Sequence, residues 1–267
     1  MKKSILQKKL YLLDLDGTLY LDCLLFEGTK PFLQAIKQSG GAYLFLTNNS
    51  SKGVESYVEK LCRMGVECVA EDFVTSVHAT VEYLNAHHPE KLFYVFGTKS
   101  FRAQLEQGGV LTTDELCDGI EGLVMGFDTE LTFKKLEDAC ILLKNDIPYI
   151  AANMDYVCPT AYGYVPDCGS VAQMIKNATG KEPLFIGKPK SGMIDLAIQK
   201  MGYTKEDTVF IGDRIYTDIA CGKESGIDTV LVLSGEGTLE EAESQQIFPT
   251  WVYEDVGEIA KELNALH

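Results

Sequence analysis

One stretch decides the fold of this chain: Leu-Tyr-Leu-Leu-Asp-Leu-Asp-Gly-Thr-Leu-Tyr at residues 10–20. Its first four residues are apolar, which is typical of a strand buried on both faces of a parallel sheet. The apolar run ends in two carboxylates, Asp14 and Asp16, and Gly17 then permits a turn that residues with a Cβ resist. Ligands of open α/β sheets collect outside the carboxyl ends of the strands. The stretch therefore predicts a first strand that carries two acidic side chains to a ligand site.

The residues that follow favour alternating strands and helices. Asp16-Gly17 is also a common hairpin dipeptide, but the helical pattern at residues 28–40 argues against a hairpin. Further strands are expected at residues 42–46, 184–186, 209–211, 229–233 and 251–253, and further helices at 54–62, 194–198 and 256–266. Such alternation predicts parallel strands joined by right-handed crossovers.

The middle of the chain has the pattern of a second α/β unit. Strands are expected at residues 92–96, 123–127 and 149–152, followed by a long loop at 153–169 and a helix through Ile175. This stretch is large enough to fold around its own core. The predicted fold class is therefore α/β, with a Rossmann-like parallel-sheet core at residues 1–76 and 183–267. A smaller α/β domain at residues 77–182 interrupts that core.

Composition and charge exclude several classes of protein. The formal net charge of −15 over 267 residues disfavours nucleic-acid polymers and anionic membranes as partners. No apolar run reaches the length of a membrane span, and the two acidic residues interrupt the first apolar run too early for a signal peptide. The eight cysteines include no Cys-x-x-Cys pair, so reduced thiols and a cytoplasmic location are expected.

Polar side chains follow four of the predicted core strands. They are Asp14 and Asp16, then Thr47, then Lys188, then Asp213 with Asp218 beyond it. Because the carboxyl ends of parallel strands meet at one edge of a sheet, we expect these side chains to converge there.

This set is chemically coherent with a metal ion and a phosphate. Several carboxylates share a pocket in ionised form only with a compensating cation, and oxygen ligands without His or Cys favour Mg²⁺. Lys188 is a cation that can hold a carboxylate and a phosphoryl oxygen together. Thr47 and the amides of Asn48 and Asn49 precede a predicted helix, where free N–H groups attract an anion.

Each of these residues also has an ordinary structural interpretation. Thr47 or Ser51 would serve as a helix cap, Lys188 as a solvated loop lysine, and Asp213 as an exposed turn residue. Their combination in this order favours the functional interpretation. Gly235-Glu236-Gly237, by contrast, is too short a glycine-rich fragment to indicate a nucleotide site.

Four motifs in this set resemble those of the haloacid dehalogenase superfamily of phosphohydrolases. Asp-Leu-Asp-Gly-Thr at residues 14–18 is similar to the first motif, and Thr-Asn-Asn at 47–49 to the second. Gly-Lys-Pro at 187–189 is similar to the third, and residues 212–218 to the fourth. The insertion carries Ala-Asn-Met-Asp at 152–155 and Pro-Asp-Cys-Gly-Ser at 166–170. It resembles the cap of the NagD-like, p-nitrophenylphosphatase subfamily.

The resemblance implies roles for the acidic residues. Asp14 would be the nucleophile, forming an aspartyl-phosphate, and would also bind Mg²⁺. Asp16 would act as general acid and then general base, and would offer Mg²⁺ its backbone carbonyl. Asp213 would be a further metal ligand, and Asp218 would support the ligands without contacting the ion.

The resemblance also implies how the substrate is held. Thr47, Asn48 and Asn49 would bind the phosphoryl oxygens, and Lys188 would orient Asp14 and offset the developing charge. The implied reaction is Mg²⁺-dependent hydrolysis of a small phosphorylated metabolite, either a nucleotide monophosphate or a sugar phosphate. p-Nitrophenyl phosphate would be an artificial substrate. Family members often associate through the cap, which leaves a homo-oligomer open.

The sequence departs from the family pattern in three places. Lys190 stands where Ser often follows Gly-Lys-Pro, and Thr250-Trp251 replaces the usual Pro-Asp. Asp167-Cys168 stands in the cap loop, where small residues are frequent. That loop is expected to overhang the active site, so this last departure bears most on the choice of substrate.

Two rival functions use similar residues. A metal-free dehalogenase of the same fold needs no second Asp at the first motif, so Asp16 argues against it. A non-enzymatic phospho-receiver or scaffold would also combine acidic residues with Thr and Lys. Receivers are shorter, however, and lack both a cap and the second carboxylate.

Overall fold

The structure is a computed structural model that describes residues 4–160 and 162–265. Its contacts divide the chain into two compact units. The first unit comprises Met1–Thr47, Tyr57–Val74 and Lys188–His267, and the second comprises Asn48–Ser56 and Thr75–Gly187.

The first unit is built on a six-stranded sheet in the order β15-β14-β13-β1-β4-β5. Its strands are β1 (Leu10–Leu13), β4 (Ala42–Thr47), β5 (Phe73–Thr75), β13 (Thr208–Gly212), β14 (Asp228–Val232) and β15 (Trp251–Tyr253). β1 pairs in parallel with both β4 and β13, and all four of its side chains are fully buried. The apolar run at residues 10–13 is therefore the central parallel strand that its composition predicts.

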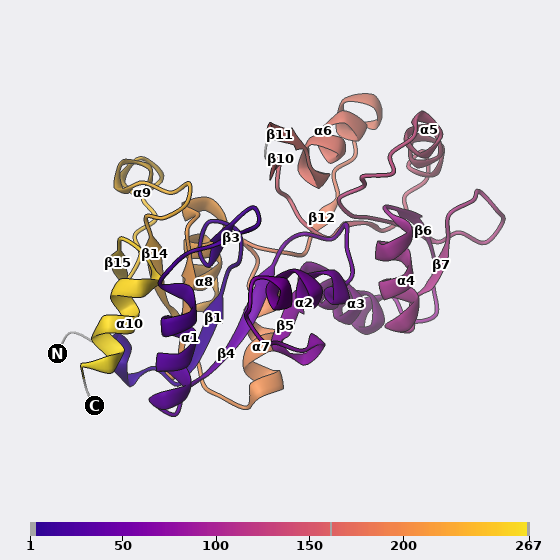
Figure 1. The fold of residues 1–267 in the computed structure, drawn as a ribbon. Coiled ribbons are helices and arrows are strands. Elements are labelled where there is room, and N and C mark those ends of the chain that lie inside the picture. Colours follow the sequence, from indigo (N-terminus) through magenta and orange to yellow (C-terminus); the bar gives the residue numbers. More distant parts are fainter. Residues whose placement is uncertain (1–3, 161, 266–267) are drawn as a thin grey trace. The chain divides into compact units, whose positions relative to one another are not determined.

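Helices flank this sheet. They are α1 (Thr29–Gln38), α2 (Val54–Arg63), α7 (Gly192–Met201), α8 (Ala220–Ser225), α9 (Leu239–Gln245) and α10 (Val256–Asn264), with short turns η1 (Ile5–Gln7), η2 (Ala70–Asp72) and η3 (Ile215–Ile219). α1 and α10 lie side by side, although they come from opposite ends of the chain (Figure 1). They approach closely because Gly28 and Gly257 meet there, and a Cβ on Gly28 would overlap the Gly257 backbone.

The second unit has its own sheet, in the order β12-β9-β8-β6-β7 (Figure 1). Its strands are β6 (Leu92–Phe96), β7 (Leu111–Thr113), β8 (Gly122–Met125), β9 (Tyr149–Ala151) and β12 (Leu184–Phe185), and its helices are α3 (Ser76–His87), α4 (Lys99–Gln107), α5 (Phe133–Leu142) and α6 (Cys168–Thr179). The neighbouring strands pair in parallel. Tyr94, Phe96 and Leu123 are among the buried side chains of its core. The α/β fold class, with two parallel sheets, is confirmed.

The helix ends follow signals present in the sequence. The hydroxyls of Thr98 and Thr132 accept hydrogen bonds from backbone N–H groups in the first turns of α4 and α5. Gly180 and Gly202 end α6 and α7 with left-handed backbone conformations.

The strand predicted at residues 184–186 lies in a different sheet from the one expected. β12 pairs with β9, with Leu184 opposite Ile150 and Phe185 opposite Ala151. Lys188 therefore does not follow a strand of the first sheet, and the prediction that all four strand ends belong to one sheet was wrong. A short apolar run predicts a buried strand but not its pairing partner.

The prediction of a long loop at residues 153–169 was also wrong. It contains an antiparallel hairpin, β10 (Val157–Thr160) and β11 (Gly163–Pro166), which leads into α6. Most of its side chains are exposed or half-buried. A two-stranded ribbon without a buried face has no apolar alternation to reveal it in the sequence.

A smaller hairpin follows the first strand. β2 (Tyr20–Leu21) pairs with β3 (Leu24–Leu25), so the turn lies at Asp22-Cys23 rather than at Asp16-Gly17. β7, α8 and α9 were likewise not expected, because each is too short to establish a period.

Two predictions from composition can be compared with the structure. None of the helices within residues 4–160 and 162–265 combines the length and the apolar character that crossing a membrane requires. Cys168 and Cys221 are buried free thiols, and Cys23, Cys62 and Cys117 are exposed free thiols.

Candidate active site

The centre of the candidate site is the carboxyl end of β1. The backbone N–H of Asp14 donates to the Ile211 carbonyl at 2.9 Å, so the pairing with β13 continues past the end of β1. Asp213 follows β13 directly. Asp14 and Asp213 therefore lie on adjacent strand ends, as the sequence predicts.

Lys188 joins two of the acidic side chains. Its Nζ lies 2.5 Å from Oδ1 of Asp14 and 2.8 Å from Oδ1 of Asp218. The Lys188 side chain is only 4% exposed, and burial alone would lower its pKa. The charges of Asp14 and Asp218 outweigh that effect and raise the pKa of Lys188, so it stays protonated.

Asp213 is held by groups that the sequence analysis did not identify. The Thr18 hydroxyl donates to its Oδ1 at 3.3 Å, and the backbone N–H of Glu236 donates to its Oδ2 at 2.9 Å. The N–H of Gly237 also donates to the Asp213 carbonyl at 2.8 Å. The Gly235-Glu236-Gly237 fragment is therefore a loop whose backbone lies against Asp213. Its glycines were the sequence feature that could have predicted this contact, because a backbone that approaches another group closely requires small residues.

Asp218 lies on η3, a short π-helical turn that begins two residues after Asp213. Its Oδ2 accepts a hydrogen bond from the Arg214 backbone N–H at 3.1 Å, while its Oδ1 accepts from Lys188. Both oxygens of Asp218 are thus occupied within the protein, and its side chain is 1% exposed.

The three carboxylates of Asp14, Asp213 and Asp218 could hold a metal ion. Each offers an oxygen, and the three oxygens lie within 4.8 Å of one another. Burial raises the pKa of Asp14 well above its ordinary value, and Asp218 and Asp213 add to this effect, although Lys188 opposes it. Burial and then the charge of Asp218 raise the pKa of Asp213 to about 7. An excess of buried negative charge is the condition that a divalent cation relieves, so the residues fit a metal ion.

Asp16 stands apart from this cluster. Its side chain is 42% exposed, and it interacts with Tyr20 and Lys60 rather than with the other carboxylates. Gly17, which follows it, has a φ of +87°, and a Cβ there would overlap the Asp213 carboxylate. Glycine is therefore needed at this position for both conformation and space.

The second motif divides between the two units. Thr47 is buried at the end of β4, the strand beside β1. In the second unit, Asn48 donates its side-chain amide to Asp155 at 2.8 Å, and Asn49 accepts from the backbone N–H of Ser51 at 2.9 Å. The structure thus brings together Asp14, Lys188, Asp213 and Asp218, with Asp16 and Thr47 on neighbouring segments of the same unit.

The departure at Asp167-Cys168 has a structural explanation. Asp167 is buried, and its Oδ1 accepts hydrogen bonds from the Cys168 backbone N–H at 2.5 Å and from the Asn153 side chain at 3.0 Å. It caps the start of α6. The carboxylate of Asp167 therefore links the loop to the start of the helix and to Asn153, two contacts that alanine or glycine would not make.

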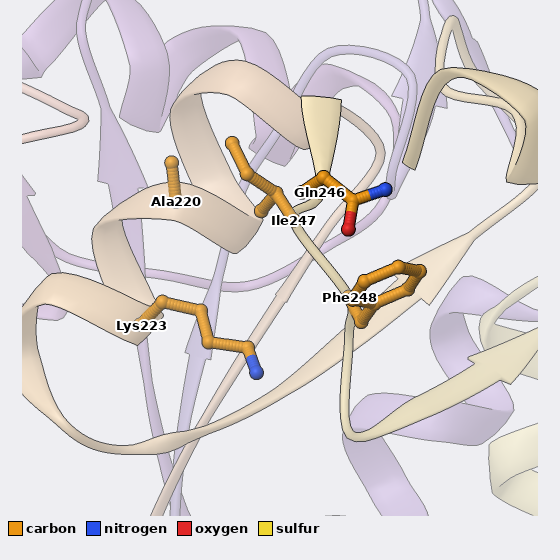
Figure 2. Close-up of a pocket in the computed structure, with 5 residues that line it drawn as sticks. All are labelled: Ala220, Lys223, Gln246, Ile247 and Phe248. Carbon is orange, nitrogen blue, oxygen red and sulfur yellow. The ribbon is translucent and has the colours of Figure 1, made fainter. Parts of the chain in front are cut away.

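A cavity of about 270 Å³ in the first unit contains none of the predicted site residues. Figure 2 shows its five lining residues, which are Ala220, Lys223, Gln246, Ile247 and Phe248. This set includes one cation and no carboxylate, so the cavity adds nothing to the chemistry of the acidic cluster.

Comparison with known proteins agrees with this geometry. The family model for haloacid dehalogenase-like hydrolases matches residues 11–111, and a HAD-hydrolase-like model matches residues 185–259. An acid sugar phosphatase of Staphylococcus aureus is 32% identical over 257 residues, which cover 96% of this chain and 98% of that protein.

Solved structures extend the likeness to the whole fold. The 4-nitrophenylphosphatase of Thermotoga maritima is 38% identical with a TM-score of 0.91, covering 97% of this chain and 99% of that one. NagD from E. coli K-12 is 30% identical with a TM-score of 0.85, covering 94% and 98%. The chain therefore belongs to the haloacid dehalogenase-like hydrolases, in the branch of NagD and the 4-nitrophenyl phosphatases.

Proposed function

We propose that the chain hydrolyses phosphomonoesters of small metabolites through an aspartyl-phosphate on Asp14, with Mg²⁺ as its cofactor. The observation that carries the proposal is the pairing of Asp14 with Lys188 beside two further carboxylates. One lysine does not neutralise three carboxylates, so a metal ion is needed to balance their charge. The lysine and the metal together would then attract an anionic phosphoryl group.

In the first step, an oxygen of Asp14 forms a bond to phosphorus while the bond from phosphorus to the ester oxygen breaks. The electron pair of that bond goes to the leaving oxygen, which takes a proton from the carboxyl group of Asp16. Lys188 holds the other side of Asp14 in place, at 2.5 Å from Oδ1. The leaving group departs as a neutral alcohol, and Asp16 becomes a carboxylate.

In the second step, a water oxygen forms a bond to phosphorus and gives a proton to the Asp16 carboxylate. The bond between phosphorus and Asp14 breaks, and its electron pair restores the Asp14 carboxylate. Inorganic phosphate leaves, and Asp16 is again protonated for the next cycle. Thr47, Asn48 and Asn49 bind the phosphoryl oxygens in both steps.

The metal would be held by the side chains of Asp14 and Asp213 and by the backbone carbonyl of Asp16. Asp218 keeps both oxygens on Lys188 and the Arg214 N–H, so we assign it a supporting role. When bound, Mg²⁺ supplies positive charge against the phosphoryl oxygens. Carboxylate and carbonyl oxygens are the donors that Mg²⁺ prefers.

We assign the two units different tasks. The first unit carries the chemistry, and the second acts as a cap that selects the substrate. Lys190 is 53% exposed in its side chain and lies 3.8 Å from Glu224, so its charge is shared with a surface carboxylate. The naming of relatives as acid sugar phosphatases favours a sugar phosphate over a nucleotide monophosphate. We also propose a cytoplasmic location. We further propose that the chain self-associates through the second unit, which sedimentation of the purified chain tests.

The rival functions lack support from specific observations. A metal-free dehalogenase has no use for a cluster of three carboxylates, two of them buried. A receiver or scaffold would keep its phosphoryl group, so it would not need Asp16 as a general acid or base. Lasting phosphorylation of Asp14 without phosphate release would favour the receiver.

The test is phosphate release from p-nitrophenyl phosphate, with and without Mg²⁺. We expect Mg²⁺-dependent turnover that Asp14→Asn abolishes. The matched control is Asp22→Asn, an exposed residue with a φ of +54° that Asn tolerates well, and it should keep full activity. A panel of sugar phosphates and nucleotide monophosphates then identifies the substrate. Absence of turnover on every substrate, from folded protein in Mg²⁺, would reject the proposal.

A further inference from the structure

Two side chains outside the four motifs hold the carboxylate of Asp16. Tyr20 lies on β2, and Lys60 lies on α2. The Tyr20 hydroxyl donates to Oδ2 of Asp16 at 3.1 Å, and Lys60 Nζ lies 3.5 Å from Oδ1. Each oxygen of Asp16 therefore faces its own donor.

Tyr20 is a rigid partner. Its side chain is fully buried, so packing fixes the position of the ring and of the hydroxyl oxygen. Burial, and then the negative charge of Asp16, raise the pKa of Tyr20 far above its ordinary value. The phenol therefore stays neutral and remains a hydrogen-bond donor.

Lys60 links the other two residues. Its Nζ lies 3.9 Å from the centroid of the Tyr20 ring, within the range of a cation–π interaction. The same ammonium group faces Asp16, and the side chain is 31% exposed. A lysine fixed on an aromatic ring loses less freedom when it binds a carboxylate than a solvated lysine does.

We propose that Tyr20 and Lys60 are positioning residues that hold Asp16 in the orientation needed to pass a proton to the leaving group. The inference rests on the proposed function and extends it. Tyr20 holds Oδ2 by the shorter contact, at 3.1 Å, whereas Lys60 lies 3.5 Å from Oδ1, so Oδ1 is the less tightly held oxygen and the one that delivers the proton. As the ester bond breaks, the leaving oxygen receives the electron pair and takes the proton from Oδ1. The resulting carboxylate is stabilised by both donors.

The proposal predicts a dependence on the leaving group. 4-Nitrophenolate leaves readily as an anion, whereas a sugar or alkyl alkoxide must be protonated as it leaves. Loss of the positioning contacts should therefore slow alkyl phosphates selectively. A merely structural role would lower turnover of both substrates by the same factor.

The experiment compares kcat/KM for p-nitrophenyl phosphate and for the best alkyl phosphate of the metabolite panel. We expect Tyr20→Phe and Lys60→Met to lower the alkyl value by about 10- to 100-fold, and the aryl value by less than about 3-fold. Lys60→Arg should restore most of the alkyl activity, because it keeps the charge. Asp16→Asn removes the general acid itself, so it should show the largest selective loss of alkyl phosphate activity.

The matched control is Lys37→Met. Lys37 also lies over a tyrosine ring, 5.2 Å from the centroid of Tyr43, but this lysine is on α1 and its ring partner is on β4. It should leave the ratio of the two substrates unchanged. Equal losses on both substrates in Tyr20→Phe and Lys60→Met would overturn the inference while leaving the proposed function intact. No turnover by the native chain on either substrate would instead reject the proposed function, and the inference with it.

Discussion

The two parallel sheets place different charge balances at their carboxyl ends. After β1 and β13 of the first sheet, the carboxylates of Asp14, Asp213 and Asp218 lie close together, and Lys188 pairs with Asp14 and Asp218. After β8 of the second sheet, Asp128 pairs with Lys135 at 2.7 Å, and the same lysine donates to the Gly97 carbonyl at 2.8 Å. The carboxyl ends of β1 and β13 thus carry an excess of negative charge, and the segment after β8 carries a matched pair.

The difference teaches that residue type at a strand end does not by itself indicate function. Both sheets have the topology in which ligands bind, and both carry a buried Asp and a Lys there. A neutral pair needs nothing further, so it serves the fold. An unbalanced cluster costs free energy until another cation binds, and that cost indicates a metal site.

The largest expected effect is the difference between substituting Lys188 and substituting Lys135. Lys188→Met removes the cation that holds Asp14, and we expect kcat to fall by about 10²- to 10³-fold or more. Lys135→Met leaves Asp128 buried without its partner, so the free energy of unfolding should fall by about 3–5 kcal/mol. Phosphate release and urea unfolding measure the two effects.

The outcomes of the two lysine variants should be opposite in kind. Lys135→Met should keep kcat under conditions where it is folded. If Lys135→Met loses turnover as Lys188→Met does, the assignment of the chemistry to the first sheet alone is wrong.

Much of the first sheet could be predicted from the sequence. The apolar run at residues 10–13 has a composition typical of a central parallel strand, and Asp14 and Asp213 lie together because β1 and β13 are adjacent. Such inferences need only local pattern and the rule that parallel strands end at one edge. The acidic cluster follows from them.

The rest could not be predicted because it depends on pairing between distant segments. Leu184 and Phe185 are apolar in either sheet, and only the partner strand β9 decides between them. The Glu236 backbone N–H reaches Asp213 through loop geometry, and an N–H group leaves no trace in the sequence. Tyr20 and Lys60 lie in no motif, since their relation to Asp16 arises from the packing of α2.

The next effect in size concerns pH and metal. The folded-state pKa of Asp213 is raised from 3.8 to about 7, so its contribution to stability is full below about pH 4 and is lost as the pH rises through 7. Metal binding requires the ionised form, so stabilisation by Mg²⁺ should grow over the same window. We expect the rise in Tm on adding Mg²⁺ to be small at pH 5 and several degrees at pH 8.

Two variants test whether the first cluster causes this response. Asp213→Asn should abolish the rise in Tm with Mg²⁺ and should stabilise the metal-free chain at pH 8, because it removes a buried charge from the cluster. Asp128→Asn, in the second sheet, should lower Tm at every pH but keep the response to Mg²⁺. An Mg²⁺ response that is equal at pH 5 and pH 8 would contradict the argument.

The smallest expected effect comes from the glycines that pack on each sheet end. A Cβ on Gly235 would overlap the Asp213 carboxylate, and a Cβ on Gly122 would overlap the Phe93 ring in the second core. Each substitution should lower the free energy of unfolding by about 1–3 kcal/mol, because the added methyl group overpacks the site. Only Gly235→Ala should displace Asp213, the proposed metal ligand, so it alone should weaken stabilisation by Mg²⁺, measured as the concentration that gives half the rise in Tm. Gly192→Ala, where no atom lies within 4 Å of the new Cβ, should not destabilise helix α7 and should leave the Mg²⁺ response unchanged. If Gly122→Ala weakens the Mg²⁺ response as much as Gly235→Ala does, the response reports general loosening of the fold rather than the position of Asp213.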